Sequence, residues 1–169
     1  LEPTPQPGGD LATKTPSRMA LAHLWQQGIE WDEDFPAVQA LTIIERQALL
    51  NQLEKDINTP LTSSTGRLFD AASALIGVCE TVNYEAQAAI ELEALADTTE
   101  KGSYPFDIQK DSPMIGLNPF WKALTADIRH GVTLNGMAAR FHNSLIQLVL
   151  EISTHLRQKH GINTVVLSG

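Results

Sequence analysis

The chain has 169 residues, of which 43% are hydrophobic and 19% charged, and this composition is typical of one globular domain rather than a disordered segment. Its net charge of −8 at pH 7 comes without a stripe of basic and aromatic residues, which argues against a nucleic-acid-binding surface. No apolar run is long enough to cross a membrane, and the first residues do not form a signal peptide. We therefore expect a cytoplasmic protein with neither nucleic acid nor membrane as a partner.

Metal and thiol chemistry find little support in the sequence. Cys79 is the single cysteine, so an internal disulfide and a multi-cysteine zinc site are both excluded. Its position between Val78 and Glu80 is typical of a small core residue, and the sequence indicates no base that could activate the thiol. The histidines are scattered along the chain: His23, His130, His142, His155 and His160. The last two stand five residues apart on an expected helix, a poor spacing for a shared ligand, so we expect no metal site.

The first residues differ in pattern from those that follow. Residues 1–15 contain three prolines and two glycines with almost no apolar periodicity, which predicts an extended arm or loop. Residues 16–169 read as a single, mostly helical domain. Its first helix is expected to begin at Pro16, with Thr15 as the cap, and to end near Gly28.

Helical patterns continue through the first half of the chain. Residues 29–40 are acidic and contain a proline, so we expect a loop there. Thr42 and Glu45 then have the spacing of a capping box, which predicts the start of a helix. Alanine-rich sequence predicts two further helices, over residues 64–77 and about 84–96.

The period of the pattern changes in the second half. Residues 104–108 and 114–117 flank the sequence QKDSP and predict two short strands joined by a turn. A helix is expected over residues 118–131. The longest periodic run predicts another helix over residues 134–161, with basic residues at its carboxyl end and a glycine as the stop.

The last residues predict an isolated strand. Thr164–Leu167 is apolar and β-branched, as in a buried strand, yet few residues follow that could supply neighbouring strands. We expect this segment to pair with the predicted hairpin or with a sheet edge of another copy, which would give a homo-oligomer. Ser168 and Gly169 resemble the start of a phosphate loop, so the chain reads as a truncated portion of a larger catalytic domain.

One side of the helix over residues 64–77 is unusually small. Gly66, Ser73, Ala74 and Gly77 share this side with Asp70. Glycine inside a helix costs about 1 kcal/mol relative to alanine, so close approach by a ligand or another backbone is indicated. Asp70 in such a groove could accept hydrogen bonds from ribose hydroxyls. A tight helix–helix contact with Asp70 at its solvated rim is the alternative, and the pattern leaves it open.

A pair of catalytic carboxylates is not indicated by the glutamates near the middle of the chain. Glu91 and Glu93 are two residues apart on a helix and therefore lie on different faces, and Glu85 has no partner in the pattern. His142 could line a site, although packing or capping is the simpler role. The catalytic residues stay unknown from the sequence.

Several segments together resemble one family. GRLFDAASALIG followed by NYEAQAAIELEALA is similar to a run in the carboxy-terminal domain of hydrogenase-maturation carbamoyltransferases, the HypF family. PGGDLATKTPSRMALAHL, SYPFDI and ARFHNSLIQLVLEI, with GINTVVLSG at the end, agree in the same order. A weaker similarity extends to the tRNA threonylcarbamoyl-adenosine synthesis proteins and to O-carbamoyltransferases. The resemblance implies a mainly α fold with a small β component, the helical part of an ASKHA (actin-like ATPase) type domain.

The resemblance also implies a reaction. Family enzymes use carbamoyl phosphate and ATP, through a carbamoyl-adenylate, to carbamoylate the carboxy-terminal cysteine of the partner protein HypE. That group later becomes a cyanide ligand of [NiFe]-hydrogenase. The family's metal ligands would lie outside this chain, and we expect no cofactor to be retained by these 169 residues, which we expect to be inactive alone. The alternatives are a non-catalytic helical interaction module and a fragment of a related O-carbamoyltransferase.

The resemblance assigns candidate nucleotide-binding residues by position. Asp70 matches the aspartate that holds the nucleotide ribose, and Gly66 precedes it on the same helix. Gln87 falls where the wider superfamily has a glycine near the nucleotide, whereas the carbamoyltransferases usually have a glycine one place earlier, at Ala86 here. A methyl group at Ala86 would be awkward if the backbone requires a positive φ. Ser168 and Gly169 match the beginning of the phosphate-contacting loop.

Overall fold

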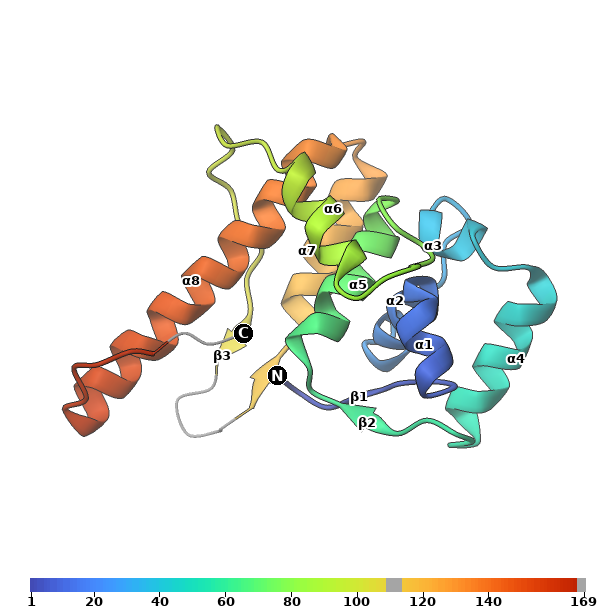
Figure 1. Cartoon of the computed structure of the whole chain (residues 1–169), viewed down its shortest axis with the longest axis horizontal. Helices are drawn as coiled ribbons and strands as arrows, with labels where there is room; N and C mark the ends of the chain where they lie inside the picture. Colours follow the sequence, from blue (N-terminus) through green and yellow to red (C-terminus); the bar gives the residue numbers. More distant parts are fainter. Residues whose placement is uncertain (109–113, 167–169) are drawn as a thin grey trace.

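The fold is known from a computed structural model that describes residues 1–108 and 114–166 (Figure 1). Helices dominate these described residues, in which four short strands form two separate antiparallel pairs. The predicted mainly α architecture with a small β component is therefore confirmed. In chain order the elements are β1 (Thr4–Pro5), α1 (Asp10–Lys14), α2 (Pro16–Gln26), α3 (Pro36–Gln39), α4 (Ile43–Glu54), β2 (Leu61–Thr62), α5 (Thr65–Ile76), α6 (Gln87–Leu95), β3 (Asp107–Ile108), β4 (Ile115–Gly116), α7 (Asn118–Arg129) and α8 (Leu134–His160).

Helices α2 and α5 form the centre of the core and pack against each other. Nine consecutive residues of α2, from Pro16 to Leu24, are buried, so this helix is covered on nearly all sides. α7 and α8 close the core with aromatic rings, of which Phe120, Trp121 and Phe141 have no exposed surface. Each fully buried side chain of this size contributes about 2 kcal/mol through the removal of apolar surface from water.

Local sequence signals start two of the helices as expected. The Thr42 hydroxyl accepts a hydrogen bond from the Glu45 amide at 3.2 Å, and the Glu45 carboxylate accepts one from the Thr42 amide at 2.8 Å. This reciprocal pair confirms the predicted capping box of α4. Pro16 occupies the first turn of α2 as expected, whereas the predicted side-chain cap by Thr15 is wrong, because its hydroxyl accepts no hydrogen bond from an amide of the first turn.

The amino-terminal segment is more ordered than its composition predicts. Residues 1–15 were expected to form an arm or loop, but Asp10–Lys14 is helical and Ala12 is fully buried. β1 pairs with β2, and the amide of Gly8 donates to the carbonyl of Asn58 at 2.8 Å. Contacts with a distant part of the chain therefore fix this segment, which no local pattern could indicate.

Two further boundaries differ from the sequence-based expectation. Pro36–Gln39 forms the one-turn helix α3 inside the expected loop, because a proline in the first turn has no N–H that would need a partner and its fixed φ suits a helix. α6 begins at Gln87 instead of near Tyr84, since the chain first turns through Ala86 in a left-handed conformation. The hairpin is confirmed as β3 paired with β4, and its expected turn, residues 109–113, lies outside the described residues.

The predicted strand at the carboxyl end is wrong over its described part. Residues 164–166 have no strand conformation and are exposed, and Leu167 lies outside the described residues. A β-branched run becomes a strand only where a ladder partner is available, and this segment joins neither of the two described strand pairs. Pairing with another copy stays a prediction.

Helix α8 is the longest element and extends beyond the core. Its 27 residues begin after Thr133, whose hydroxyl accepts from the amide of Gly136, and end before the cap Gly161, which has a φ of 68°. Among the described helices, α8 included, none is both long enough and apolar enough to cross a membrane. The last turns of α8 project away from the other helices at the lower left of Figure 1.

Candidate functional site

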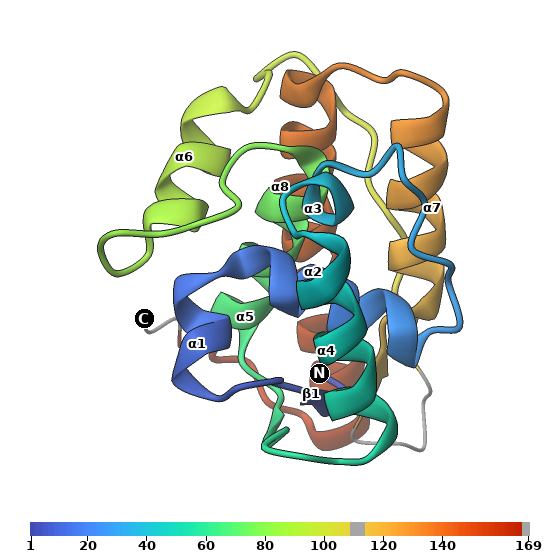
Figure 2. The same cartoon turned by 90° about the vertical axis from the view of Figure 1, so that its right-hand side faces the viewer.

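A cavity of about 590 Å³ lies between α1, α5 and the loop that leads into α6. α1 supplies Thr13 and Lys14, and the amide of Val82 donates to the carbonyl of Lys14 at 3.0 Å, which holds the loop against this helix. Figure 2 shows α1, α5 and the α6 loop on the same side of the molecule. The lining residues are Thr13, Lys14, Arg67, Asp70, Val82, Asn83, Tyr84, Glu85 and Ala86.

Asp70 is the buried charge of this cavity. It is 5% exposed, and its Oδ2 lies 2.9 Å from Nη1 of Arg67, one helical turn earlier on α5. The two charges attract, yet neither of these two atoms has a hydrogen-bond partner. Burial raises the pKa of the Asp70 carboxyl because it penalises the charged form, and this outweighs the opposing effect of Arg67. A buried carboxylate oxygen that meets no hydrogen-bond donor in suitable geometry is costly, and this makes Asp70 a candidate ligand-binding residue.

Ala86 has a positive φ, the backbone conformation in which a methyl group was expected to be awkward. Its φ is 61° and its ψ 11°, in the left-handed region that alanine rarely adopts. Ala86 lines the same cavity as Asp70, so the structure brings these two candidate residues together. The expected difficulty of a methyl group at this position is therefore real, since glycine has no such conformational cost.

Gln87 supports the loop and is not part of the cavity wall. Its side-chain oxygen accepts from the amide of Asn83 at 2.8 Å, and its side-chain nitrogen donates to Glu91 at 2.8 Å. These bonds hold the chain in the turn that precedes α6. Gln87 therefore acts on the site through the loop.

The two glycines of α5 have different surroundings. Gly66 is exposed in the first turn, and a Cβ there would meet only the Ser64 hydroxyl, at 3.4 Å. Gly77 has a φ of 90°, and a Cβ there would lie 2.9 Å from Pro36. Helix packing therefore explains Gly77, as the alternative interpretation of this helix proposed, but it does not explain the open side of Gly66. Ser168 and Gly169 lie outside the described residues.

Sequence reasoning missed Arg67, Lys14 and Tyr84. A basic residue three positions before a candidate aspartate on one helix face was the available signal for Arg67. Lys14 and Tyr84 approach Asp70 only because the α6 loop binds to α1, and no local pattern indicates that contact.

The other candidates have structural roles. Cys79 is buried, and burial together with the nearby charge of Glu91 raises the pKa of its thiol to about 11, so it is protonated and unreactive at neutral pH. Nδ1 of His142 is 2.8 Å from the carbonyl of Ala138, and its ring packs edge-on against Phe141. Among the described residues, no group of three or more His, Cys, Asp or Glu is arranged to hold a metal ion.

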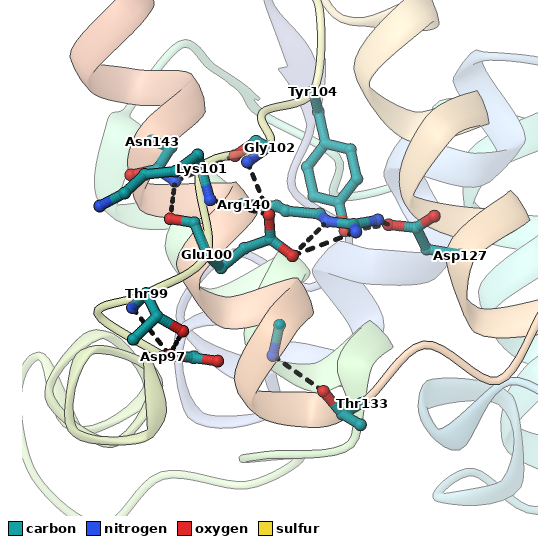
Figure 3. Close-up of polar contacts among 11 residues, drawn as sticks. Asp97, Thr99, Glu100, Lys101, Gly102, Tyr104, Asp127, Thr133, Arg140 and Asn143 are labelled. Carbon is teal, nitrogen blue, oxygen red and sulfur yellow. Dashed lines mark hydrogen bonds and ion pairs between the residues drawn. The ribbon is translucent and has the colours of Figure 1, made fainter.

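A second polar cluster binds the segment before β3 to α7 and α8. Figure 3 shows Arg140 between Glu100 and Asp127, with Nη1 donating to Asp127 at 2.7 Å and Nε and Nη2 donating to Glu100 at 3.2 and 3.1 Å. The hydroxyl of Tyr104 also donates to Asp127, at 2.8 Å, and burial raises the pKa of this tyrosine. Because these bonds satisfy the charged groups, the cluster is a structural clamp and not a ligand site.

Comparison with known proteins identifies the family. Residues 1–169 match the family model described as carbamoyltransferase, Kae1-like domain, second subdomain. The whole chain is 34% identical over 190 residues to carbamoyltransferase HypF of Synechocystis, of which it covers 24%. It is also 35% identical over 179 residues to the carbamoyltransferase HypF homolog of Cupriavidus necator, of which it covers 45%. The chain thus spans less than half the length of these relatives.

Solved structures agree with this result. The crystal structure of full-length HypF in its phosphate- and nucleotide-bound form covers the whole chain with 32% identity and a TM-score of 0.87, and the chain covers 26% of that protein. The structure of HypF from T. kodakarensis, 24% identical with a TM-score of 0.74 over 96% of this chain and 22% of its own, supports the fold alone. The predicted ASKHA-type fold is thereby confirmed. Since the family model spans the entire chain and relatives above 30% identity contain all of it, the chain belongs to the HypF carbamoyltransferase family.

Proposed function

We propose that these residues form one subdomain of a carbamoyltransferase of [NiFe]-hydrogenase maturation and supply part of its nucleotide site. The enzyme would use carbamoyl phosphate and ATP, through a carbamoyl-adenylate, to carbamoylate the carboxy-terminal cysteine of a HypE-type protein in the cytoplasm. Family membership over residues 1–169 supports this assignment. The observation that carries the nucleotide role is the buried Asp70, which lines a cavity of about 590 Å³ and whose Oδ2 has no hydrogen-bond partner among the described residues.

Asp70 suits the ribose of a nucleotide. A carboxylate can accept hydrogen bonds from two neighbouring hydroxyls at once, which would satisfy the oxygen that lacks a donor. Ala86 lines the cavity, and Gly66, one helical turn before Asp70, has an open side although it is not part of the lining. We assign the phosphate contacts in part to Ser168 and Gly169, as the start of a loop. The solved HypF structure in its phosphate- and nucleotide-bound form is consistent with such a site.

The contribution of this chain to the reaction is to bind and orient the donor. Transfer of a carbamoyl group to a thiolate requires a positioned acyl donor and stabilisation of the developing oxyanion. Cys79 cannot be the acceptor, because its thiol is buried and protonated. The described residues provide no ligand set for the metal that the family implies, so we assign no step to a metal here. We expect the 169 residues alone to be inactive.

Transfer of the carbamoyl group tests this function. The complete enzyme is given radiolabelled carbamoyl phosphate, ATP and a HypE-type acceptor, and the label on the acceptor is measured. We expect Asp70→Asn to reduce transfer at limiting ATP about 30-fold or more, the equivalent of about 2 kcal/mol for charge-assisted hydrogen bonds. Asp34→Asn, at an exposed site in the loop before α3, is the control and should be without effect. Full transfer by the Asp70 variant would overturn the nucleotide role.

A further inference from the structure

We propose that Arg67 is a second ligand-binding residue of the same cavity: it neutralises Asp70 when the cavity is empty and binds the phosphate when a nucleotide ribose takes its place. This inference rests on the proposed nucleotide site. It assigns to Arg67 the ability to distinguish a nucleotide from a nucleoside.

The contact between Arg67 and Asp70 is close but incomplete. Nη1 of Arg67 lies 2.9 Å from Oδ2 of Asp70, and both atoms are buried without a hydrogen-bond partner. The Arg67 side chain is 24% exposed and the Asp70 side chain 7% exposed. The guanidinium therefore compensates the buried charge without satisfying its hydrogen bonds, so a ligand that supplies both donors would replace it.

Arg140 is a structural arginine of the same molecule with which Arg67 can be compared. Its guanidinium donates three hydrogen bonds, to carboxylate oxygens of Glu100 and Asp127, at 2.7 to 3.2 Å. Among the described residues Arg67 has a single carboxylate partner, and that 2.9 Å contact lacks hydrogen-bond geometry at the two closest atoms. The geometry at Arg67 thus leaves donors free for a further anion, whereas the geometry at Arg140 does not.

The charges of the cavity define the chemical class of the ligand. Asp70 can accept from a diol, and the displaced guanidinium then requires an anion. Lys14 is exposed on the opposing α1 wall and adds a second positive charge to the same lining. The exposed Glu85 also lines the cavity, so two carboxylates and two cations face it. The buried Asp70 carboxylate beside the Arg67 guanidinium matches a molecule that carries both a ribose diol and a phosphate, which is a 5′-nucleotide.

The test compares adenosine with AMP and with inorganic phosphate. The chemical shifts of the amides that line the cavity are followed by NMR in the 169-residue chain. Each ligand is added up to about 20 mM, so that dissociation constants above about 1 mM, which correspond to a binding free energy of about −4 kcal/mol, are still detected. We expect the chain to bind AMP about tenfold more tightly than adenosine. In Arg67→Gln this preference should disappear, while adenosine should bind as well as before or better, because its competitor for Asp70 is gone.

Three variants and the wild-type titration separate the outcomes. Arg67→Lys should restore part of the AMP preference, and Arg46→Gln, which removes a cation of α4 paired with Glu33, should leave it unchanged. Equal weakening of adenosine and AMP by Arg67→Gln, an unchanged AMP preference, or inorganic phosphate shifting the same amides as strongly as AMP would overturn the role of Arg67 alone. Absence of any shift with the wild-type chain would instead overturn the nucleotide site itself.

Discussion

At the residue scale, Ala86 stands in a conformation that costs stability. Its φ of 61° places the methyl group against its own backbone, at a cost of about 1 kcal/mol. We expect Ala86→Gly to raise the free energy of unfolding by about 1 kcal/mol and the melting temperature by about 3 °C. The measurement is thermal unfolding followed by circular dichroism.

The matched control for this prediction is a second alanine-to-glycine change. Ala94 is exposed within α6 and has ordinary helical geometry, so Ala94→Gly should lower stability by about 1 kcal/mol. Destabilisation by both substitutions would show that the left-handed conformation of Ala86 is not a source of strain.

His23 makes the stability of the chain depend on pH. It is 3% exposed, its Nδ1 lies 3.3 Å from the hydroxyl of Thr4, and burial lowers the pKa of its imidazole to about 3. The unfolded chain binds a proton near pH 6.5, whereas the folded chain does not until about pH 3. The contribution of His23 to the free energy of unfolding is therefore complete above pH 6.5 and declines as the pH falls below that value.

We expect this histidine to remove about 2 kcal/mol of stability between pH 6.5 and pH 5. Urea unfolding at a series of pH values measures the effect. His23→Asn has no titrating group in this range, so its stability should change less between the two pH values than that of the wild-type chain. The same pH dependence in both proteins would show that His23 is not its source.

At the element scale, α8 consists of a packed half and an exposed half. Its last buried side chain is Leu148, and the residues from Val149 to His160 are at most partly covered by the described chain. Apolar side chains nevertheless continue through this half, including Leu150 at 56% and Leu156 at 41% exposed. An isolated helix of this length is marginally stable in water, so the exposed half should open more readily.

Hydrogen exchange measures this difference directly. We expect the amides of α8 beyond Leu148 to exchange at least tenfold faster than those between Met137 and Leu148. If the carboxyl segment pairs with another copy, as the sequence predicts, protection of the exposed half would rise with protein concentration. Uniform, concentration-independent protection along α8 would contradict the division into two halves.

At the scale of the whole molecule, the sequence predicts those features that depend on neighbouring residues. The capping box at Thr42 is a local pair, and α8 carries an apolar period long enough to be distinctive. α1 was not predicted, because its five residues are stabilised by contacts with distant segments and not by a local pattern. The strand predicted over Thr164–Leu167 is wrong over its described residues, 164–166, for the converse reason: its composition is favourable, but it pairs with no strand of the described chain.

In the candidate site, too, the features that depend on neighbouring residues could be predicted and those that depend on distant contacts could not. The resemblance and the small residues of α5 together pointed to Asp70, and the expected strain at Ala86 followed from the type of residue alone. The burial of Asp70, its ion pair with Arg67 and the wall that contains Lys14 could not be predicted. They arise where α1, α5 and the α6 loop meet, and only the folded chain brings those segments together.

The central claim is that Asp70 binds a nucleotide in this cavity. NMR titration of the 169-residue chain with AMP, beside Asp70→Asn as the matched isosteric variant, tests it most directly. The account predicts weak binding with shifts confined to amides of α1, α5 and the α6 loop, and at least tenfold weaker binding by the variant. Shifts elsewhere in the chain, or equal affinity of the two proteins, would contradict it.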